Sequence, residues 1–404
     1  MPTRILYVQA TFVPPPANLE ADRFFLLSQK LDGDILQPVW FRTSDEVEAL
    51  FGPGSYPVYT AGRFRYHWFL SGRYHGIRQR VATFWFYIRT GLAIYRERRF
   101  TCIVAYSHMT TGLCAGFLKL VTRARLIIEI VTAPQKVYLT ERPQPTWSER
   151  LMHLYSDACL HLSLLLADRA HFLFPRQLSM YRMLRNVKNS VFHEFVPIST
   201  VQRHREDDGQ LYVLLIGAPW YLKGADLLIE AFLRLAPDFP DVKLKILGYF
   251  PSGDKLHELI GGARQIEVLK AMGHTDALRV ISGAAIMALP SRCEGLPRVL
   301  IEGMAAGLPL VGSDVAGIPF LIRQGENGFV IPEGDSKLLE ARLRELLSDP
   351  SLRARMGANS YRRAHEELSE AVYVTQFSRM VEDTVGAASS EDREDRDHVV
   401  GSIG

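Results

Sequence analysis

Apolar runs and amphipathic stretches alternate along most of the chain. Short, mostly apolar runs, typical of strands covered on both faces, occupy 5–9, 35–41, 102–106, 126–131, 211–216, 242–247 and 284–289. Between them, apolar positions recur with helical spacing, which predicts helices at 19–31, 77–98, 111–121, 148–164, 225–235, 338–347 and 356–385. This alternation of strand and helix favours an α/β architecture with doubly wound parallel sheets.

The length and composition indicate two globular domains. A chain of 404 residues, with 47% hydrophobic and 23% charged residues, can build two separate hydrophobic cores. Residues 200–209 are polar and nearly free of apolar side chains, which predicts a linker between a first domain at 1–199 and a second at 210–370. The polar, acidic residues 387–404 predict a disordered tail.

Targeting signals and cysteine usage favour a cytoplasmic protein. The first ten residues have one early arginine and a short apolar run, too little for a signal peptide. No apolar run approaches the roughly 18–20 residues that a membrane span requires. The four cysteines form no C-x-x-C pair, which favours a reduced compartment and argues against a zinc site.

Charge is distributed unevenly between the two halves. Residues 1–200 hold 24 Lys and Arg against 14 Asp and Glu, whereas the remainder holds 23 against 30. Between Arg63 and Arg99, nine arginines accompany a single acid, Glu97, and aromatic residues are interleaved with them. Arginine with Trp and Tyr suits an anionic membrane surface, with the protein peripheral on the inner face of the cell membrane. The alternative is an amphipathic helix whose aromatics pack inward; no nucleic-acid-binding motif is present.

Two glutamates follow the apolar run at 284–289. Glu294 lies in a Gly/Pro loop and Glu302 in a short predicted helix, which Pro297 is suited to begin. The loop before Arg298 therefore offers free N–H groups and the positive end of a helix dipole, where an anion can bind. A carboxylate one turn deeper could accept hydrogen bonds from vicinal hydroxyls, so the pattern suits a ligand that carries phosphate and sugar. On spacing alone, a helix-capping Glu294 and a surface Glu302 are the alternative.

The segment 290–311 resembles the signature of retaining glycosyltransferases of glycosyltransferase family 4. In that signature seven residues separate two glutamates, and Glu294 and Glu302 fit this spacing. Further family-like segments occur in the expected order at 223–232, 317–319 and 326–332. The resemblance is strong from 211 to 335 and weak over the first half of the chain.

This resemblance implies the GT-B fold and a donor site in the second domain. In that fold two doubly wound Rossmann-like domains face a cleft, and a last helix, here 371–386, crosses back to the first domain. The resemblance implies that Lys223 neutralises phosphate, that Glu302 accepts the ribose hydroxyls and that Glu294 contacts the donor sugar. The donor-binding residues that it implies are Gly217, Lys223, Gly273, His274, Glu294, Gly295, Leu296, Pro297, Arg298 and Glu302.

The resemblance also implies catalytic residues. Ser107-His108 follows a predicted strand and resembles the segment that carries the family's acceptor-side histidine. We therefore predict His108, Glu294 and Lys223 as catalytic residues.

The sequence departs from the family pattern at several places. Ala218 stands where the family usually has a phosphate-binding arginine, so we expect either that Arg292 or Arg298 substitutes or that diphosphate binding is weaker. The turn at 11–18 lacks the usual glycines, and 131–134 lacks a frequent histidine. The identity of the acceptor is therefore not transferred from the family.

No metal or other cofactor is expected. Residues 32–34, Asp-Gly-Asp, look like the metal-binding triplet of the other glycosyltransferase fold, but nothing around them supports that function. We predict a surface turn there instead.

The sequence predicts a metal-independent retaining glycosyltransferase. It would transfer a sugar from a UDP- or GDP-sugar to a lipid-linked or polysaccharide acceptor at the cytoplasmic membrane face. Two alternatives stay open: a catalytically silent accessory subunit with the same fold, and another GT-B enzyme such as a nucleotide-sugar epimerase.

Overall fold

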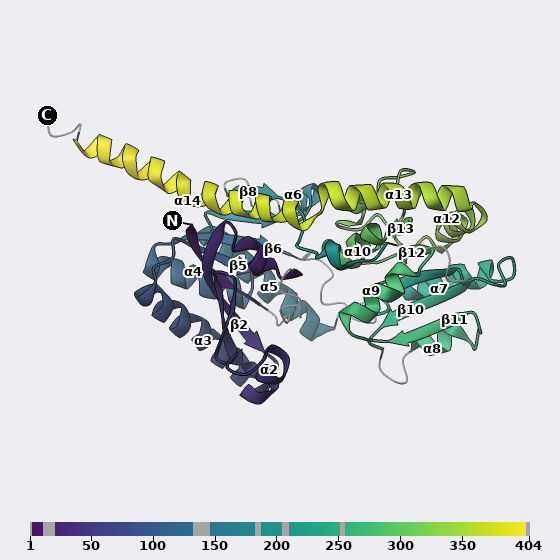
Figure 1. Ribbon diagram of the computed structural model, residues 1–404, viewed down its shortest axis with the longest axis horizontal. Helices are drawn as coiled ribbons and strands as arrows, with labels where there is room; N and C mark the ends of the chain where they lie inside the picture. Colours follow the sequence, from purple (N-terminus) through teal and green to yellow (C-terminus); the bar gives the residue numbers. More distant parts are fainter. Residues whose placement is uncertain are drawn as a thin grey trace.

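Two α/β domains lie side by side in the computed structural model (Figure 1). The structure describes residues 2–10, 21–131, 146–181, 187–203, 210–250 and 255–400, with side chains described as far as 386 except that of residue 149. The predicted turn at 11–18, residues 132–134 and most of the predicted linker lie outside the described residues.

The first domain is built on an eight-stranded sheet, in the order β3-β4-β2-β1-β5-β6-β7-β8 within the described part of the chain. Neighbouring strands are parallel, except that β3 runs antiparallel to β4. The strands are β1 (Thr3–Val8), β2 (Leu31–Val39), β3 (Val58–Ala61), β4 (Phe64–Leu70), β5 (Cys102–Tyr106), β6 (Arg125–Ile130), β7 (Arg169–Phe172) and β8 (Lys188–Val191).

Helices cover both faces of this sheet. On β5, Cys102 and Val104 pack into the core beneath α1 (Arg23–Leu27) and α14 (Glu370–Val400). The alternate residues, Ile103 and Ala105, pack against α3 (Gly76–Glu97), α4 (Thr110–Thr122) and α5 (Trp147–Leu166). Successive strand residues point to opposite faces, so a strand covered on both sides must be apolar throughout, as the sequence pattern indicates. The remaining helices of this half are α2 (Ser44–Phe51) and α6 (Pro175–Met180), with the 3-10 turns η2 (Ser71–Arg73) and η4 (Ile198–Thr200).

The second domain has a six-stranded parallel sheet, in the order β11-β10-β9-β12-β13-β14. Its strands are β9 (Tyr212–Ile216), β10 (Lys243–Gly248), β11 (Ile266–Lys270), β12 (Ile286–Leu289), β13 (Leu310–Ser313) and β14 (Gly328–Ile331). Its helices are α7 (Ala225–Leu235), α8 (Lys255–Ile260), α9 (His274–Ser282), α10 (Arg298–Ala306), α11 (Ile318–Leu321), α12 (Ser336–Ser348) and α13 (Pro350–Glu367). One core lies under α7, α8 and α12, and the other lies under α9, α10 and α11.

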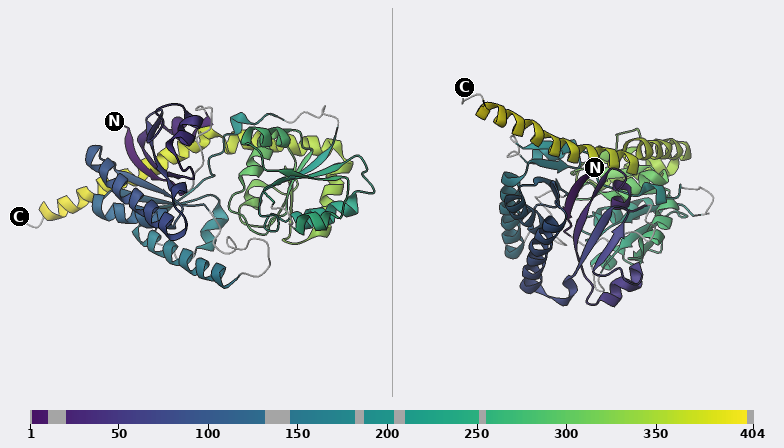
Figure 2. Two further views of the ribbon diagram at one scale, coloured as in Figure 1. Left: turned by 90° about the horizontal axis from the view of Figure 1, so that it is seen from below. Right: turned by 60° about the vertical axis from the view of Figure 1, so that its left-hand side comes forward.

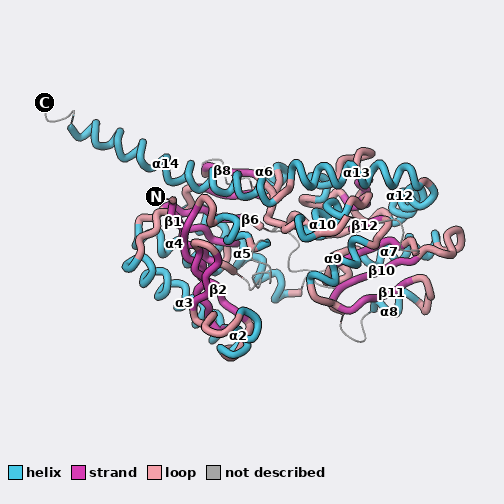
Figure 3. Tube along the Cα trace, in the orientation of Figure 1, coloured by secondary structure: helices cyan, strands magenta, loops and turns pink. Residues whose placement is uncertain are grey.

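The C-terminal helix α14 returns to the first domain, as Figures 2 and 3 show. Tyr373 and Phe377 are buried in the first domain's core, and Arg169 Nε donates to Thr384 Oγ1 at 2.8 Å. The structure differs from the sequence prediction beyond 387, where α14 continues to Val400 instead of ending in disorder. Residues 387–400 contain neither Gly nor Pro, so nothing in the backbone chemistry ends the helix earlier. No helix in the described ranges is both long and apolar enough to cross a membrane.

The prediction of a surface turn at 32–34 is wrong, because these residues belong to β2. Arg4 makes a bidentate ion pair with Asp32 at 2.7 and 2.8 Å. Asp34 is 1% exposed and accepts from Arg65 and His67, each at 2.8 Å. Burial alone would raise the pKa of Asp34, but the hydrogen bonds from His67 and Arg65 lower it. Both aspartates are therefore occupied by structural ion pairs. The early onset of β2 also ends α1 at Leu27, short of the predicted helix.

Candidate functional site

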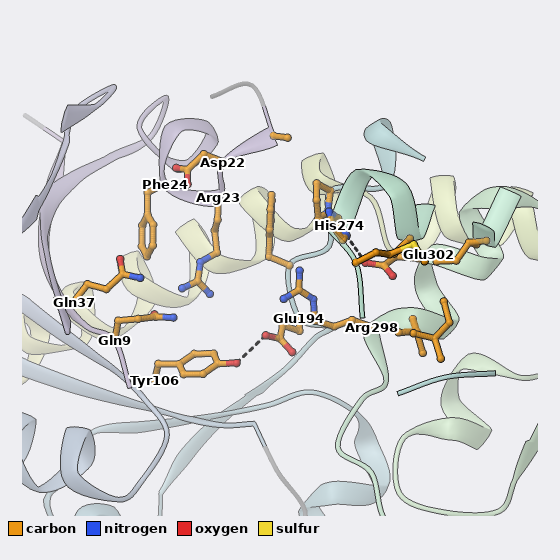
Figure 4. A pocket seen from close by; sticks show the side chains of 18 of the residues that line it. Gln9, Asp22, Arg23, Phe24, Gln37, Tyr106, Glu194, His274, Arg298 and Glu302 are labelled. Carbon is orange, nitrogen blue, oxygen red and sulfur yellow. Dashed lines mark hydrogen bonds and ion pairs between the residues drawn. The ribbon is translucent and has the colours of Figure 1, made fainter. Parts of the chain in front are cut away.

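A cavity of about 680 Å³ lies between the two domains (Figure 4). The first domain lines it with Gln9, Gln37 and Tyr106, at or near the carboxyl ends of β1, β2 and β5. The second domain contributes Ile216, at the end of β9, together with residues of α9 and α10. Open parallel sheets bind ligands at this edge, so the cavity is the candidate ligand site.

Glu302 and His274 meet on the second-domain side of the cavity. Glu302 is in α10 and is 6% exposed, and its Oε1 lies 3.0 Å from His274 Nε2. His274 is the first residue of α9 and has a half-exposed side chain. Both were predicted as donor-binding residues, and both line the cavity. A carboxylate held in this way can accept hydrogen bonds from sugar hydroxyls.

Lys223 and Glu294 form a second pair, which does not line this cavity. Lys223 Nζ lies 2.7 Å from Glu294 Oε1, which also accepts from Ser291 Oγ at 2.8 Å. Gly217 makes room for the lysine, because a Cβ at that position would lie 2.9 Å from Lys223 Cε. The structure therefore brings three of the predicted residues together, in a cluster separate from Glu302 and His274.

The loop before α10 leads into an uncapped helix end. No side chain caps the N-terminus of α10, and Pro297 at the N-cap position has no N–H of its own. Leu296 is buried, and the carbonyl of Gly295 accepts from the N–H of Gly317 at 3.0 Å. The first amides of α10 and their dipole thus remain available to an anion.

Of the two arginines expected to replace the missing one at position 218, only Arg298 faces the cavity. Arg292 makes two 2.7 Å contacts with Asp226 and donates to the carbonyl of Tyr221 at 2.6 Å, so its charge is neutralised. Arg298 lines the cavity, and its Nε is buried without a hydrogen-bond partner among the described residues. Figure 4 shows its side chain extending toward Glu194 of the first domain.

The remaining two predicted residues have different surroundings. Gly273 is the exposed N-cap of α9 and has open space where a Cβ would lie. His108 is 3% exposed, its Nε2 lies 2.8 Å from Ser156 Oγ, and it does not line the cavity. Burial lowers the pKa of His108 to about 4, so the ring is neutral at pH 7.

Sequence reasoning missed the first-domain wall of the cavity. Gln9 Oε1 is buried and has no hydrogen-bond partner within the described residues, and the hydroxyl of Tyr106 donates to Glu194 Oε1 at 2.9 Å. Gln9 and Tyr106 lie at strand ends, so the rule for ligand sites in open sheets would have identified them. Glu194 had no comparable signal.

Arg23 is a further missed residue of this wall. Its guanidinium lies over the ring of Tyr7, 4.6 Å from the centroid, and donates to Tyr373 Oη at 3.3 Å. Behind it, buried Glu129 accepts from Tyr7 and lies 3.1 Å from His171 Nδ1. Burial by itself raises the pKa of Glu129, but the hydrogen bond of His171 and the charge of Arg23 lower it overall. The carboxylate is therefore ionised near neutral pH, and its charge favours the nearby Arg23 guanidinium.

Comparison with known proteins supports a glycosyltransferase-like second half. Residues 199–363 match the family model of glycosyl transferases group 1. The chain is 35% identical over 162 residues to an Alpha-D-kanosaminyltransferase of Streptomyces kanamyceticus, covering 39% of this chain and 42% of that protein. It is 30% identical over 202 residues to a glycogen synthase of Mycobacterium tuberculosis, covering 48% and 47%. The matched part thus spans less than half the length of these two relatives.

Solved structures resemble almost the whole chain. A sucrose-phosphate synthase from Thermosynechococcus elongatus superposes with a TM-score of 0.75 at 16% identity, over 95% of this chain and all of that one. Anabaena HepE in complex with UDP-glucose gives a TM-score of 0.64 at 14% identity, over 95% and 99%. The chain has the GT-B fold. The fold expected from the sequence is confirmed, including its cleft between two Rossmann-like domains.

Proposed function

We propose that this chain is a retaining glycosyltransferase that uses a nucleotide-sugar donor. The observation that carries the proposal is the composition of one cavity wall. Glu302, which can accept hydrogen bonds from hydroxyls, lies on the same helix as Arg298 and the uncapped end of α10, which can bind phosphate. The group 1 match over 199–363 supports it, as do the UDP and UDP-glucose complexes of the HepE structures. The base, UDP or GDP, stays open.

In the proposed reaction the bond from the sugar's anomeric carbon to the diphosphate breaks while a bond to the acceptor oxygen forms on the same face. The acceptor hydroxyl gives its proton to the departing phosphate oxygen, so no separate base is needed. Arg298 and the α10 amides stabilise the charge that develops on the diphosphate. Lys223 and Glu294 are assigned to the phosphate and the sugar, and His108 to the acceptor side.

The proposed acceptor is lipid-linked or a polysaccharide, extended at the cytoplasmic membrane face. The glycogen synthase among the relatives acts on a polysaccharide by its name. The basic first half of the chain favours an acceptor held at an anionic membrane. No metal is assigned to the reaction.

Glu302→Gln tests the donor assignment. Calorimetry compares the affinity of the native chain and the variant for UDP and for GDP. The nucleotide that the native chain binds should bind the variant about 10- to 100-fold more weakly, since hydrogen bonds to a charged group contribute about 1.5–3 kcal/mol. The control is Glu258→Gln, at an exposed position on α8, which should bind as the native chain does.

Three outcomes would reject the proposal. Unchanged nucleotide binding and turnover in Glu302→Gln would show that Glu302 does not bind the donor. A native chain that binds no nucleotide would indicate the accessory subunit, and conversion of the donor sugar without an acceptor would indicate the epimerase.

A further inference from the structure

Helix α3 exposes a continuous apolar stripe. Ile77, Val81, Phe84 and Trp85 are spaced so that they lie on one side of the helix, and Ile77 is 79% and Trp85 52% exposed. Further along the helix Ile88 continues on this side and is buried, together with Tyr87 and Ile94, in the core against the sheet. Soluble monomers rarely expose large contiguous apolar patches, so this stripe calls for a partner.

Helix α5 repeats the same pattern. Trp147, Leu151, Leu154 and Tyr155 follow the same spacing as the stripe of α3, with Trp147 80% and Leu154 64% exposed. Both helices pack against α4 in the layer that covers one face of the first sheet. α4 thus lies between the two helices that carry the stripes. We call these eight side chains the α3–α5 surface.

The α3–α5 surface lies at the cleft end of the first domain. In a parallel α/β sheet, helices begin at the edge where the preceding strands end, which is the edge that holds the cavity. The stripe of α3 lies in its first three turns, and that of α5 lies in its first three turns as well. A partner bound there would therefore border the edge of the sheet that lines the cavity.

Exposed arginines flank both stripes. Arg78, Arg80 and Arg89 of α3 and Arg150 of α5 are all exposed. Along α3 the first acidic residue is Glu97, at its last position. The α3–α5 surface thus combines Trp and aliphatic side chains with cations, and its partner must be both apolar and anionic.

We propose that the α3–α5 surface docks onto an anionic lipid bilayer, with Trp85 and Trp147 at headgroup depth and the arginines on lipid phosphates. A second copy of the chain fits less well as the partner. A two-fold interface would place the arginines of one copy against the same arginines of the other, and their like charges would repel. This docking explains how a lipid-held acceptor would reach the cleft, and in that respect it rests on the proposed function. The bilayer contact itself does not require the donor site.

The structure also corrects the extent of the surface expected from sequence. The aromatics of β4 do not contribute, because Phe64, Tyr66 and Trp68 pack into the first domain's core. Within α3, Tyr87 is buried and Phe86 and Tyr95 pack against the core, so the inward-packing alternative holds for these aromatics. The exposed stripe begins only at Ile77.

Vesicle co-sedimentation tests the docking. The native chain should bind vesicles of phosphatidylcholine mixed with phosphatidylglycerol and bind phosphatidylcholine alone much more weakly. The triple variant Ile77→Ser/Trp85→Ser/Trp147→Ser should lose at least tenfold in partitioning. Arg78→Gln/Arg80→Gln should lose roughly fivefold per arginine, from the contribution of each cation near an anionic surface.

A matched control removes apolar side chains from the second domain. Leu233→Ser/Tyr249→Ser/Leu259→Ser changes three side chains that are exposed on other surfaces, and it should bind vesicles as the native chain does. Unchanged vesicle binding in the Trp variant would overturn the docking. The docking would also be overturned if the native chain self-associated in sedimentation without lipid and the triple variant did not.

Nucleotide calorimetry on the triple variant separates the two proposals. Native UDP or GDP affinity with lost vesicle binding supports the docking and leaves the donor site intact. Absent nucleotide binding in the native chain would reject the proposed function while vesicle binding still tests the α3–α5 surface.

Discussion

The buried imidazole of His108 makes the stability of the first domain depend on pH. The pKa of His108 is lowered to about 4 by burial, from 6.5 in the unfolded chain. Between these values the unfolded chain binds a proton that the folded protein excludes, so the free energy of unfolding falls as the pH falls. Relative to pH 7.5, this proton linkage lowers the free energy of unfolding by about 2 kcal/mol at pH 5 and about 3 kcal/mol at pH 4.

Urea denaturation at pH 7.5 and pH 5 measures this loss in the native chain and in His108→Asn. The variant cannot titrate at that position, so its stability should fall by about 2 kcal/mol less between the two pH values. His193, whose pKa burial also lowers to about 4, is present in both chains and cancels in the comparison. His161→Asn, at an exposed position on α5, should keep the native pH dependence.

Equal pH dependence in His108→Asn and the native chain would refute the argument. It would mean that the imidazole titrates as freely in the fold as in the unfolded chain. The same variant also tests the catalytic prediction. A fall in kcat at pH 7.5, where the domain is stable, would indicate that His108 acts on the reaction, whereas unchanged turnover would assign it to packing against Ser156.

Three further predictions concern the second domain. Gly224→Ala should lower the free energy of unfolding by about 2–4 kcal/mol, since the position has φ of 70° and a Cβ would meet a backbone carbonyl oxygen at 2.0 Å. The control is Gly262→Ala, where φ is 78° but the space around the Cβ is open. In urea denaturation it should lose only the smaller free energy that comes from backbone strain. In calorimetry, Arg298→Ala should weaken nucleotide binding by about tenfold or more, whereas Arg292→Ala should leave it nearly native and lower stability by about 1–3 kcal/mol, because it leaves a carboxylate unpaired. Turnover in the presence of a chelator should equal turnover without it, and a loss that Mn²⁺ restores would contradict the metal-independent mechanism.

The second domain was predictable because its signals are local. Strand 211–216 and helix 225–235 appear as β9 and α7 almost residue for residue. Each is a dense apolar run or an amphipathic stretch bounded by Gly or Pro, so tertiary contacts had little to override. The spacing of Glu294 and Glu302 likewise fixes one glutamate before α10 and the other inside it.

Arg23 and Glu194 of the first-domain wall were not predictable, because their contacts join distant parts of the chain. Arg23 is held by Tyr7 and by Tyr373 of the returning helix, and Glu194 is held by Tyr106. None of these pairs has a spacing that sequence can recognise. The same limit explains the error at 32–34, where Asp-Gly-Asp has the composition of a turn. Its charges are instead paired across β1 and β4, and pairing of that kind depends on strand order.

Arg292 and Arg298 show how far chemistry can be assigned before geometry is known. Both flank the same loop, and sequence offered either as the replacement for the family's arginine at position 218. Asp226, in the first turn of α7, neutralises the charge of Arg292 through two hydrogen bonds. Arg292 is therefore not available to bind a phosphate. Arg298 has no such partner for its Nε among the described residues and begins α10, whose dipole adds to its own charge. Of the two arginines, Arg298 is therefore the candidate for the proposed diphosphate contact. It begins the helix that carries Glu302, so one rigid element would position both the phosphate and the ribose of the donor.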